Sequence, residues 1–182
     1  MNLGPDYLES LSKFLSLVLR HKPEVVGIEL DEEGWADVDA LIEGAVDKGK
    51  ELDRSILEAI VKHDEKQRYS FSPDKNKIRA NQGHSVQVDL GLEPVEPPKF
   101  LYYGTEERFV ERIMFQGLRP GNRNHVELAE TLEEAEASND SPDAIVFRVR
   151  ARRMHEAGLS FYQSSNGVWL AEKVPAKYLD MY

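Results

Sequence analysis

A proline-rich segment near the middle of the chain limits how the two halves can fold. Pro94, Pro97 and Pro98 lie within five residues of one another. Proline fixes φ and lacks a backbone N–H, so such a segment is disfavoured in helices and in central strands. At 182 residues, the chain also exceeds a typical domain of roughly 100 to 150 residues. We expect two domains, residues 1–90 and 100–182, joined by a linker over residues 91–99.

The composition excludes several classes of protein. Hydrophobic residues make up 41% of the sequence, enough for a core, and no apolar run approaches the ~20 residues of a membrane span. The absence of cysteine excludes disulfides and thiolate metal ligands. The segment Met1–Asp6 lacks the basic and apolar regions of a secretory signal. We expect a cytoplasmic protein.

Charge is unevenly distributed along the chain. The formal net charge is -10, whereas surfaces that bind nucleic acid are usually basic. Between residues 62 and 84, however, six basic side chains outnumber three acidic ones. This segment indicates either local phosphate binding or a solvated, charged hairpin.

The first half of the chain predicts three helices followed by a hairpin. Apolar side chains recur at helical spacing over residues 7–21, and Pro23 ends that helix. Asp37 and Asp53 each precede an amphipathic stretch and predict N-caps. Residues 68–80 predict two strands around a central turn. This order is typical of a winged-helix-like module.

The second half is richer in strands. Residues 100–103 predict a strand that ends at Gly104, and Thr105 predicts the N-cap of a helix that reaches Gln116. The other predicted elements are a strand over 126–128, a short helix from Thr131, a strand over 144–150 and a hairpin around Asn166–Gly167. We expect an α+β fold for the whole chain.

Two short segments carry side chains that suit a phosphate group. Arg20 and His21 lie on the last turn of the first predicted helix, and Ile-Arg-Ala-Asn-Gln-Gly-His-Ser spans residues 78–85. A guanidinium matches two phosphate oxygens, and an imidazole can transfer a proton. Taken singly, each arginine also fits a surface ion pair and His21 fits a helix-end residue.

The remaining histidines and glycines are less specific. His84 and His125 lack metal-ligand spacing with any partner histidine, so we expect no metal. Gly104 and Thr105, at a predicted helix start, would offer backbone N–H groups to phosphate or ribose oxygens, although most such pairs only cap a helix.

Five segments, in chain order, resemble the RNA 2′-phosphotransferase family of the NAD-dependent tRNA 2′-phosphotransferase type. They are residues 11–23, 34–36, 66–69, 78–85 and 166–170. The resemblance runs along nearly the whole chain. It implies an N-terminal winged-helix lobe and a C-terminal lobe of the ADP-ribosyltransferase type that binds NAD.

The resemblance also implies a two-step reaction. An internal RNA 2′-phosphate attacks the nicotinamide-bearing ribose carbon of NAD, and nicotinamide leaves. A neighbouring ribose hydroxyl then attacks the phosphate, which releases RNA with a free 2′-OH and ADP-ribose 1″,2″-cyclic phosphate. The implied partners are RNA with an internal 2′-phosphate and NAD, with no membrane and no obligate protein partner.

Carried over by position, the resemblance assigns three groups of residues. The catalytic group is Arg20, His21, Arg68 and Arg123. The RNA- and phosphate-binding group is Arg79, Asn81, Gln82, Gly83, His84 and Ser85. The cofactor-binding group is Tyr103, Gly104, Thr105, Glu127, Tyr162, Asn166 and Val168. Fixed guanidiniums and an imidazole suit a reaction in which a dianionic phosphate is held in line and its charge is neutralised.

The chain departs from the family pattern at two NAD-side positions. Tyr103 and Glu127 stand where the family usually has histidines. A tyrosine hydroxyl can still form a hydrogen bond with a ribose, and a carboxylate can accept a hydrogen bond from a ribose hydroxyl. Two alternatives stay open: an ADP-ribosyltransferase that acts on terminal phosphates of nucleic acid, and a non-catalytic phosphate-binding module with a degenerate NAD lobe.

Overall fold

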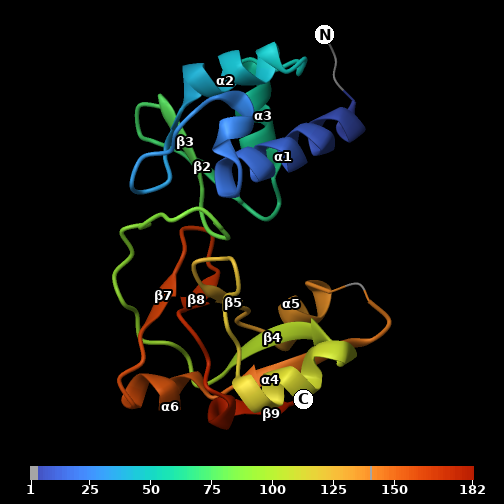
Figure 1. The fold of residues 1–182 in the computed structure, drawn as a ribbon, viewed down its shortest axis with the longest axis vertical. Helices are drawn as coiled ribbons and strands as arrows, with labels where there is room; N and C mark the ends of the chain where they lie inside the picture. The colour runs from blue at the N-terminus through green and yellow to red at the C-terminus, as the bar shows by residue number, and fades with distance from the viewer. Residues whose placement is uncertain (1–3, 140) are drawn as a thin grey trace. The chain divides into compact units, whose positions relative to one another are not determined.

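The computed structural model describes residues 4–139 and 141–182. The chain divides into two compact units, Met1–Gly91 and Leu92–Tyr182 (Figure 1). Both combine helices with small antiparallel sheets, which confirms the predicted α+β class. Residues 1–3, part of the segment expected to lack a secretory signal, lie outside the described residues. None of the described helices is long and apolar enough to cross a membrane.

The first unit places its helices before most of its sheet. Its described elements are α1 (Pro5–Arg20), η1 (Pro23–Val26), β1 (Ala36–Asp37), α2 (Val38–Asp47), α3 (Arg54–His63), β2 (Tyr69–Phe71) and β3 (Lys77–Ala80). The strands pair antiparallel in the order β1-β3-β2. The predicted helices and the hairpin are confirmed, and β1 is an additional strand.

Local sequence explains where these helices begin and end. α1 ends at Arg20, shortly before a proline that cannot continue it. Asp37 accepts a hydrogen bond from the N–H of Ala40, and Asp53 accepts one from the N–H of Ile56. Both predicted N-caps are therefore confirmed.

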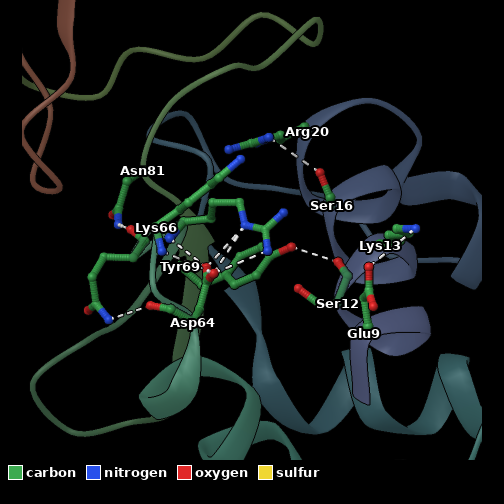
Figure 2. Close-up of polar contacts among 11 residues, drawn as sticks. Glu9, Ser12, Lys13, Ser16, Arg20, Asp64, Lys66, Tyr69 and Asn81 are labelled. Atoms are coloured by element: carbon green, nitrogen blue, oxygen red, sulfur yellow. Dashed lines mark hydrogen bonds and ion pairs between the residues drawn. The ribbon is translucent and has the colours of Figure 1, made fainter. Parts of the chain in front are cut away.

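The apolar faces of the three helices pack on the sheet in one core. Leu11, Leu15 and Leu19 recur at helical spacing on α1 and are 1% exposed or less. The hydroxyl of Tyr69 in β2 donates to the carbonyl of Ser12 over 2.7 Å. This buried hydrogen bond links the hairpin to α1 (Figure 2).

The second unit contains two small antiparallel sheets. Its described elements are β4 (Leu101–Glu106), η2 (Glu107–Phe109), α4 (Val110–Gln116), β5 (Val126–Leu128), α5 (Leu132–Ala137), β6 (Ala144–Val149), α6 (Ala151–Glu156), β7 (Phe161–Gln163), β8 (Trp169–Ala171), η3 (Ala176–Tyr178) and β9 (Leu179–Met181). The strand orders are β4-β6-β9 and β5-β8-β7. Phe147 and Phe161, one from each sheet, belong to a shared buried cluster.

The structure corrects one predicted boundary in this unit. Thr105 does not cap a helix, because β4 continues through Glu106 and α4 begins only at Val110. Thr105 lies opposite Ile145 of β6 and is 7% exposed. Strand pairing and burial of a β-branched side chain therefore outweigh its tendency to cap. The cap at Thr131 is confirmed, since its Oγ1 accepts a hydrogen bond from a backbone N–H of α5.

Gly44 lets α2 approach the η1 helix closely. A Cβ atom at this position would lie 2.2 Å from the carbonyl oxygen of Val26. In an open helix, alanine is favoured over glycine by about 1 kcal/mol. Here the close approach to backbone reverses that preference.

We expect Gly44→Ala to lower the free energy of unfolding by about 1–3 kcal/mol, because backbone must move to admit the new methyl group. Urea denaturation followed by circular dichroism measures the change. Glu43→Ala, at an exposed position of the same helix, is the control and should shift stability by less than about 0.5 kcal/mol. A gain in stability for Gly44→Ala would contradict the close packing.

Candidate functional site

Arg20, His21 and Ser85 come together at the C-terminal end of α1. Arg20 is the last residue of the helix, is 9% exposed and directs Nη1 toward Ser16 Oγ at 3.4 Å (Figure 2). Nδ1 of His21, the C-cap residue, lies 2.8 Å from Ser85 Oγ. The N–H groups of Ser85 and Val86 both donate to the Arg20 carbonyl. Segment 81–85 is therefore anchored to the helix end.

A buried carboxylate holds Arg68. Nη2 of Arg68 donates to Asp64 Oδ1 and Nε donates to Oδ2, each over 3.1 Å. The side chain of Asp64 is 5% exposed and that of Arg68 is 31% exposed. The guanidinium is fixed by a fork-to-carboxylate contact while part of it remains open to solvent. Figure 2 shows Asp64 at the centre of these contacts.

The same pair lowers the pKa of Asp64. Burial by itself would raise this pKa, but hydrogen bonds from Arg68 and from the N–H of Lys66, together with the charge of Arg68, outweigh burial. The hydrogen bond to Asp64 also raises the pKa of Arg68. Asp64 was not among the predicted site residues. Its only sequence signal was its position four residues before an arginine.

Asn81 and Gln82 form a bend beside Arg68, and Gly83 follows it. Asn81 and Gln82 are 3% and 7% exposed. Nδ2 of Asn81 donates to the Gln67 carbonyl over 2.7 Å, and its backbone N–H donates to the Arg68 carbonyl over 2.8 Å. Gly83 has a φ of 88°, a conformation that favours glycine. The Asn81 end of the predicted phosphate segment is thus held against Gln67 and Arg68 by hydrogen bonds.

Arg79 contacts the loop that precedes β1. Its guanidinium carbon lies 4.5 Å from the centroid of the Trp35 ring, and its Nη1 donates to the Glu33 carbonyl over 3.3 Å. A Cβ atom added at Gly34 would lie 3.2 Å from Nε2 of His84, which is itself 2% exposed. The Trp35 loop therefore supports both Arg79 and His84. Trp35 was not among the predicted site residues.

In the second unit, Arg123 pairs with Glu127. Nη1 of Arg123 lies 3.2 Å from Glu127 Oε1, and their side chains are 42% and 28% exposed. Burial raises the pKa of Tyr103, and among the nearby charges Arg123 acts against this shift while Glu127 adds to it. The two positions that depart from the family pattern, Tyr103 and Glu127, are therefore electrostatically linked to Arg123.

His125 and Tyr162 lie next to each other. Their ring centroids are 5.9 Å apart. Burial lowers the pKa of His125, and the carboxylates of Glu172 and Glu127 only partly oppose this effect. Burial therefore favours the neutral form of the His125 ring. His125 was not among the predicted site residues, and its contact with Tyr162 makes it a further candidate.

The other predicted NAD-side residues lie in β4 and in the β7-β8 turn. A Cβ atom at Gly104 would lie 2.2 Å from a carbonyl oxygen of α5, so this glycine allows close packing. Thr105 is buried in β4. The hydroxyl of Ser164 donates a hydrogen bond to Asn166 Oδ1 and accepts one from the N–H of Val168. Over residues 4–139 and 141–182, no cluster of three or more histidine, cysteine, aspartate or glutamate side chains could hold a metal.

The chain belongs to the RNA 2′-phosphotransferase, Tpt1 / KptA family, whose model matches residues 6–173. It is an enzyme of this family, as the resemblance predicted. The chain is 45% identical over 179 residues to a probable RNA 2′-phosphotransferase of Flavobacterium johnsoniae, with 98% of each chain covered. It is 47% identical over 174 residues to one of Pseudomonas aeruginosa strain UCBPP-PA14, covering 94% of this chain and 96% of that protein. With one of Nostoc punctiforme it shares 47% identity over 180 residues, covering 97% and 98%.

The Asp64–Arg68 pair should be a pH-dependent source of stability. We expect Asp64→Asn to lower the free energy of unfolding at pH 7 by about 1–3 kcal/mol, because a partly buried guanidinium loses its counter-charge. The pKa of Asp64 is lower in the folded than in the unfolded chain, whose ordinary value is 3.8. The stabilisation is therefore complete above that value and is lost as pH falls through the lowered folded-state pKa.

Urea denaturation of Asp64→Asn and of the unaltered protein at pH 7 and at about pH 3 tests this expectation, and the difference should shrink at the lower pH. Asp39→Asn is the matched control. It breaks a similar pair with Arg54, but the Asp39 side chain is 76% exposed, so its effect should be smaller. Equal losses for the two variants would show that burial adds nothing to the Asp64 contact.

Proposed function

We propose that this enzyme removes an internal 2′-phosphate from RNA with NAD as co-substrate. The single observation that carries the proposal is the anchoring of two arginines by one short segment. Asn81 donates to the carbonyl of Arg68 and Ser85 donates to the carbonyl of Arg20. A segment of this length spans at most roughly 14 Å between its end Cα atoms. A phosphate bound there would meet two guanidiniums and the imidazole of His21.

The proposed reaction uses these groups in two steps. A 2′-phosphate oxygen bonds to the nicotinamide-bearing ribose carbon of NAD as the bond to nicotinamide breaks. A ribose hydroxyl of the ADP-ribosyl group then attacks the phosphorus, and the RNA 2′-oxygen leaves and takes up a proton. Arg20 and Arg68 neutralise phosphate charge, and His21, oriented by Ser85, moves the proton between the attacking and leaving oxygens.

We propose that the second unit binds NAD and that its Arg123 is a catalytic residue. The pairing of Glu127 with Arg123 supports this assignment, because the carboxylate is then not an isolated anion beside a pyrophosphate. Tyr103 and Tyr162 would offer hydroxyl groups to the ribose. We further propose that the two units are a winged-helix-like lobe and an ADP-ribosyltransferase-like lobe, as the family resemblance implies.

Incubation with NAD and an oligonucleotide that carries one internal 2′-phosphate tests the proposal. We expect nicotinamide release and loss of the 2′-phosphate in equal amounts, because each phosphate consumes one NAD. Chromatography of nicotinamide and gel analysis of the RNA measure the two products. The control substrate is the same oligonucleotide with a terminal phosphate only.

The other outcomes separate the alternatives. Nicotinamide release with the terminal phosphate and not with the 2′-phosphate would indicate an ADP-ribosyltransferase that acts on nucleic-acid ends. Binding of the phosphorylated RNA without release of nicotinamide from either substrate would indicate a non-catalytic module.

Arg68→Lys tests the role of the guanidinium fork. Lysine keeps a cation beside Asp64, whereas alanine would leave that buried carboxylate without its partner. We expect the rate of 2′-phosphate removal to fall by about 10²-fold, as when other groups that stabilise a transition state are removed. Circular dichroism should report an unchanged fold. Arg54→Lys, in the exposed pair with Asp39, is the matched control and should retain full activity. Full activity of Arg68→Lys would show that Arg68 needs only its positive charge and not its guanidinium fork.

A further inference from the structure

One face of the β4-β6-β9 sheet carries a partly exposed arginine at its centre. Arg148 of β6 lies opposite Tyr102 of β4 and opposite Asp180 of β9. Its neighbours Phe147 and Val149 are 1% exposed or less, while the Arg148 side chain is 35% exposed. Since side chains alternate along a strand, Arg148 points to the face opposite the core.

Aromatic and ionic contacts hold the cations of this face in place. The guanidinium carbon of Arg148 lies 4.3 Å from the centroid of the Phe100 ring, and Lys99 Nζ lies 5.3 Å from the same centroid. Asp180 Oδ2 is 3.5 Å from Arg148 Nη2 and 3.4 Å from Arg150 Nε. Since one carboxylate serves two guanidiniums, the group keeps a net positive charge.

Backbone contacts extend the group to the neighbouring helices. The N–H of Arg152 at the start of α6 donates to the Lys99 carbonyl over 3.3 Å. Nη2 of Arg150 donates to the carbonyl of Lys177 in η3. These contacts bring the backbone of Arg152 next to Lys99 and that of Lys177 next to Arg150, and Arg152, Arg153 and Lys177 are all exposed. We call this set of neighbouring residues the cationic face: Lys99, Arg148, Arg150, Arg152, Arg153 and Lys177. This concentration of positive charge stands out in a chain whose net charge is -10.

Aromatic rings lie among these cations. Tyr102 and Tyr182 meet edge to face with centroids 6.2 Å apart, and Tyr182 is 66% exposed. Phe100 lies beneath Arg148. Aromatic rings stack on unpaired bases, and arginines neutralise phosphates, so the combination suits single-stranded RNA. An acidic protein segment would use the cations but would leave the rings without a matching partner.

We propose that the cationic face binds a single-stranded part of the RNA substrate. The identity of the nucleic acid rests on the proposed function, but the binding needs neither NAD nor a 2′-phosphate. The site would add affinity for the body of the RNA, in addition to contacts with the reacting phosphate.

Fluorescence anisotropy with a labelled single-stranded RNA that carries no 2′-phosphate, measured without NAD, tests this binding separately from catalysis. We expect the double variant Arg152→Glu/Arg153→Glu to weaken binding by about tenfold or more at low salt. The slope of log affinity against log salt should shrink by about 0.7 for each phosphate that the variant no longer neutralises. Tyr182→Ala, which changes an exposed ring, should weaken binding by about fivefold with an unchanged salt slope.

The matched control is Arg108→Glu/Arg112→Glu. It makes the same charge change in the same unit, at two arginines that lie over the Phe109 ring, and it should leave RNA affinity within about twofold of the unaltered protein. Equal weakening in both double variants would show a net-charge effect and overturn the proposal. Absence of RNA binding by the unaltered protein at low salt would do the same. Loss of binding to a labelled polyglutamate peptide, with RNA affinity unchanged, would assign the face to an acidic protein partner instead.

Discussion

The hydrogen bonding of segment 81–85 is the constraint on which the first-unit site depends. The N–H groups of Asn81 and Ser85, at its two ends, donate to the carbonyls of Arg68 and Arg20. The segment therefore limits the distance between two arginines that lie far apart in the chain. Asp64 then fixes the direction of the Arg68 guanidinium, and Ser85 fixes the ring of His21. At the phosphate site that we propose, such preorganisation would let the charged groups act without first being ordered. The buried hydrogen bond from Tyr69 to the Ser12 carbonyl also holds the β2-β3 hairpin, which precedes this segment, against α1.

The second unit combines its candidate residues through electrostatics rather than through one buried pair. Arg123 and Glu127 are both partly exposed, so their ion pair is weak and can rearrange when a ligand binds. Tyr103 is linked to both charges. The two departures from the family pattern therefore act on one neighbourhood, around the arginine that we propose as a catalytic residue. Partial burial of the Glu127 carboxylate costs less free energy when it is paired with this arginine than it would for a lone anion.

Sequence patterns predicted the elements whose signals are local. Both aspartate caps in the first unit and the Thr131 cap in the second were confirmed, because a cap depends on residues three positions apart. The prediction that Thr105 caps a helix was wrong, because pairing with β6 extends the strand β4 past this residue. The helix α6 and the strand β9 were not predicted. α6 is six residues long and has no side-chain cap, and β9 depends on pairing with the distant β6.

The sequence by itself determined the family, the α+β class and which residue types are available for phosphate chemistry, because these follow from ordered motifs and local periodicity. Only the tertiary structure decided which charges meet. Asp64 became the partner of Arg68 because a turn, not a helix, brings them together and excludes water from the carboxylate. Arg79 lies on Trp35, and Arg148 shares Asp180 with Arg150, through contacts between segments far apart in the chain. The energy of a charge depends on its burial and on its nearest partner, and both are set by packing.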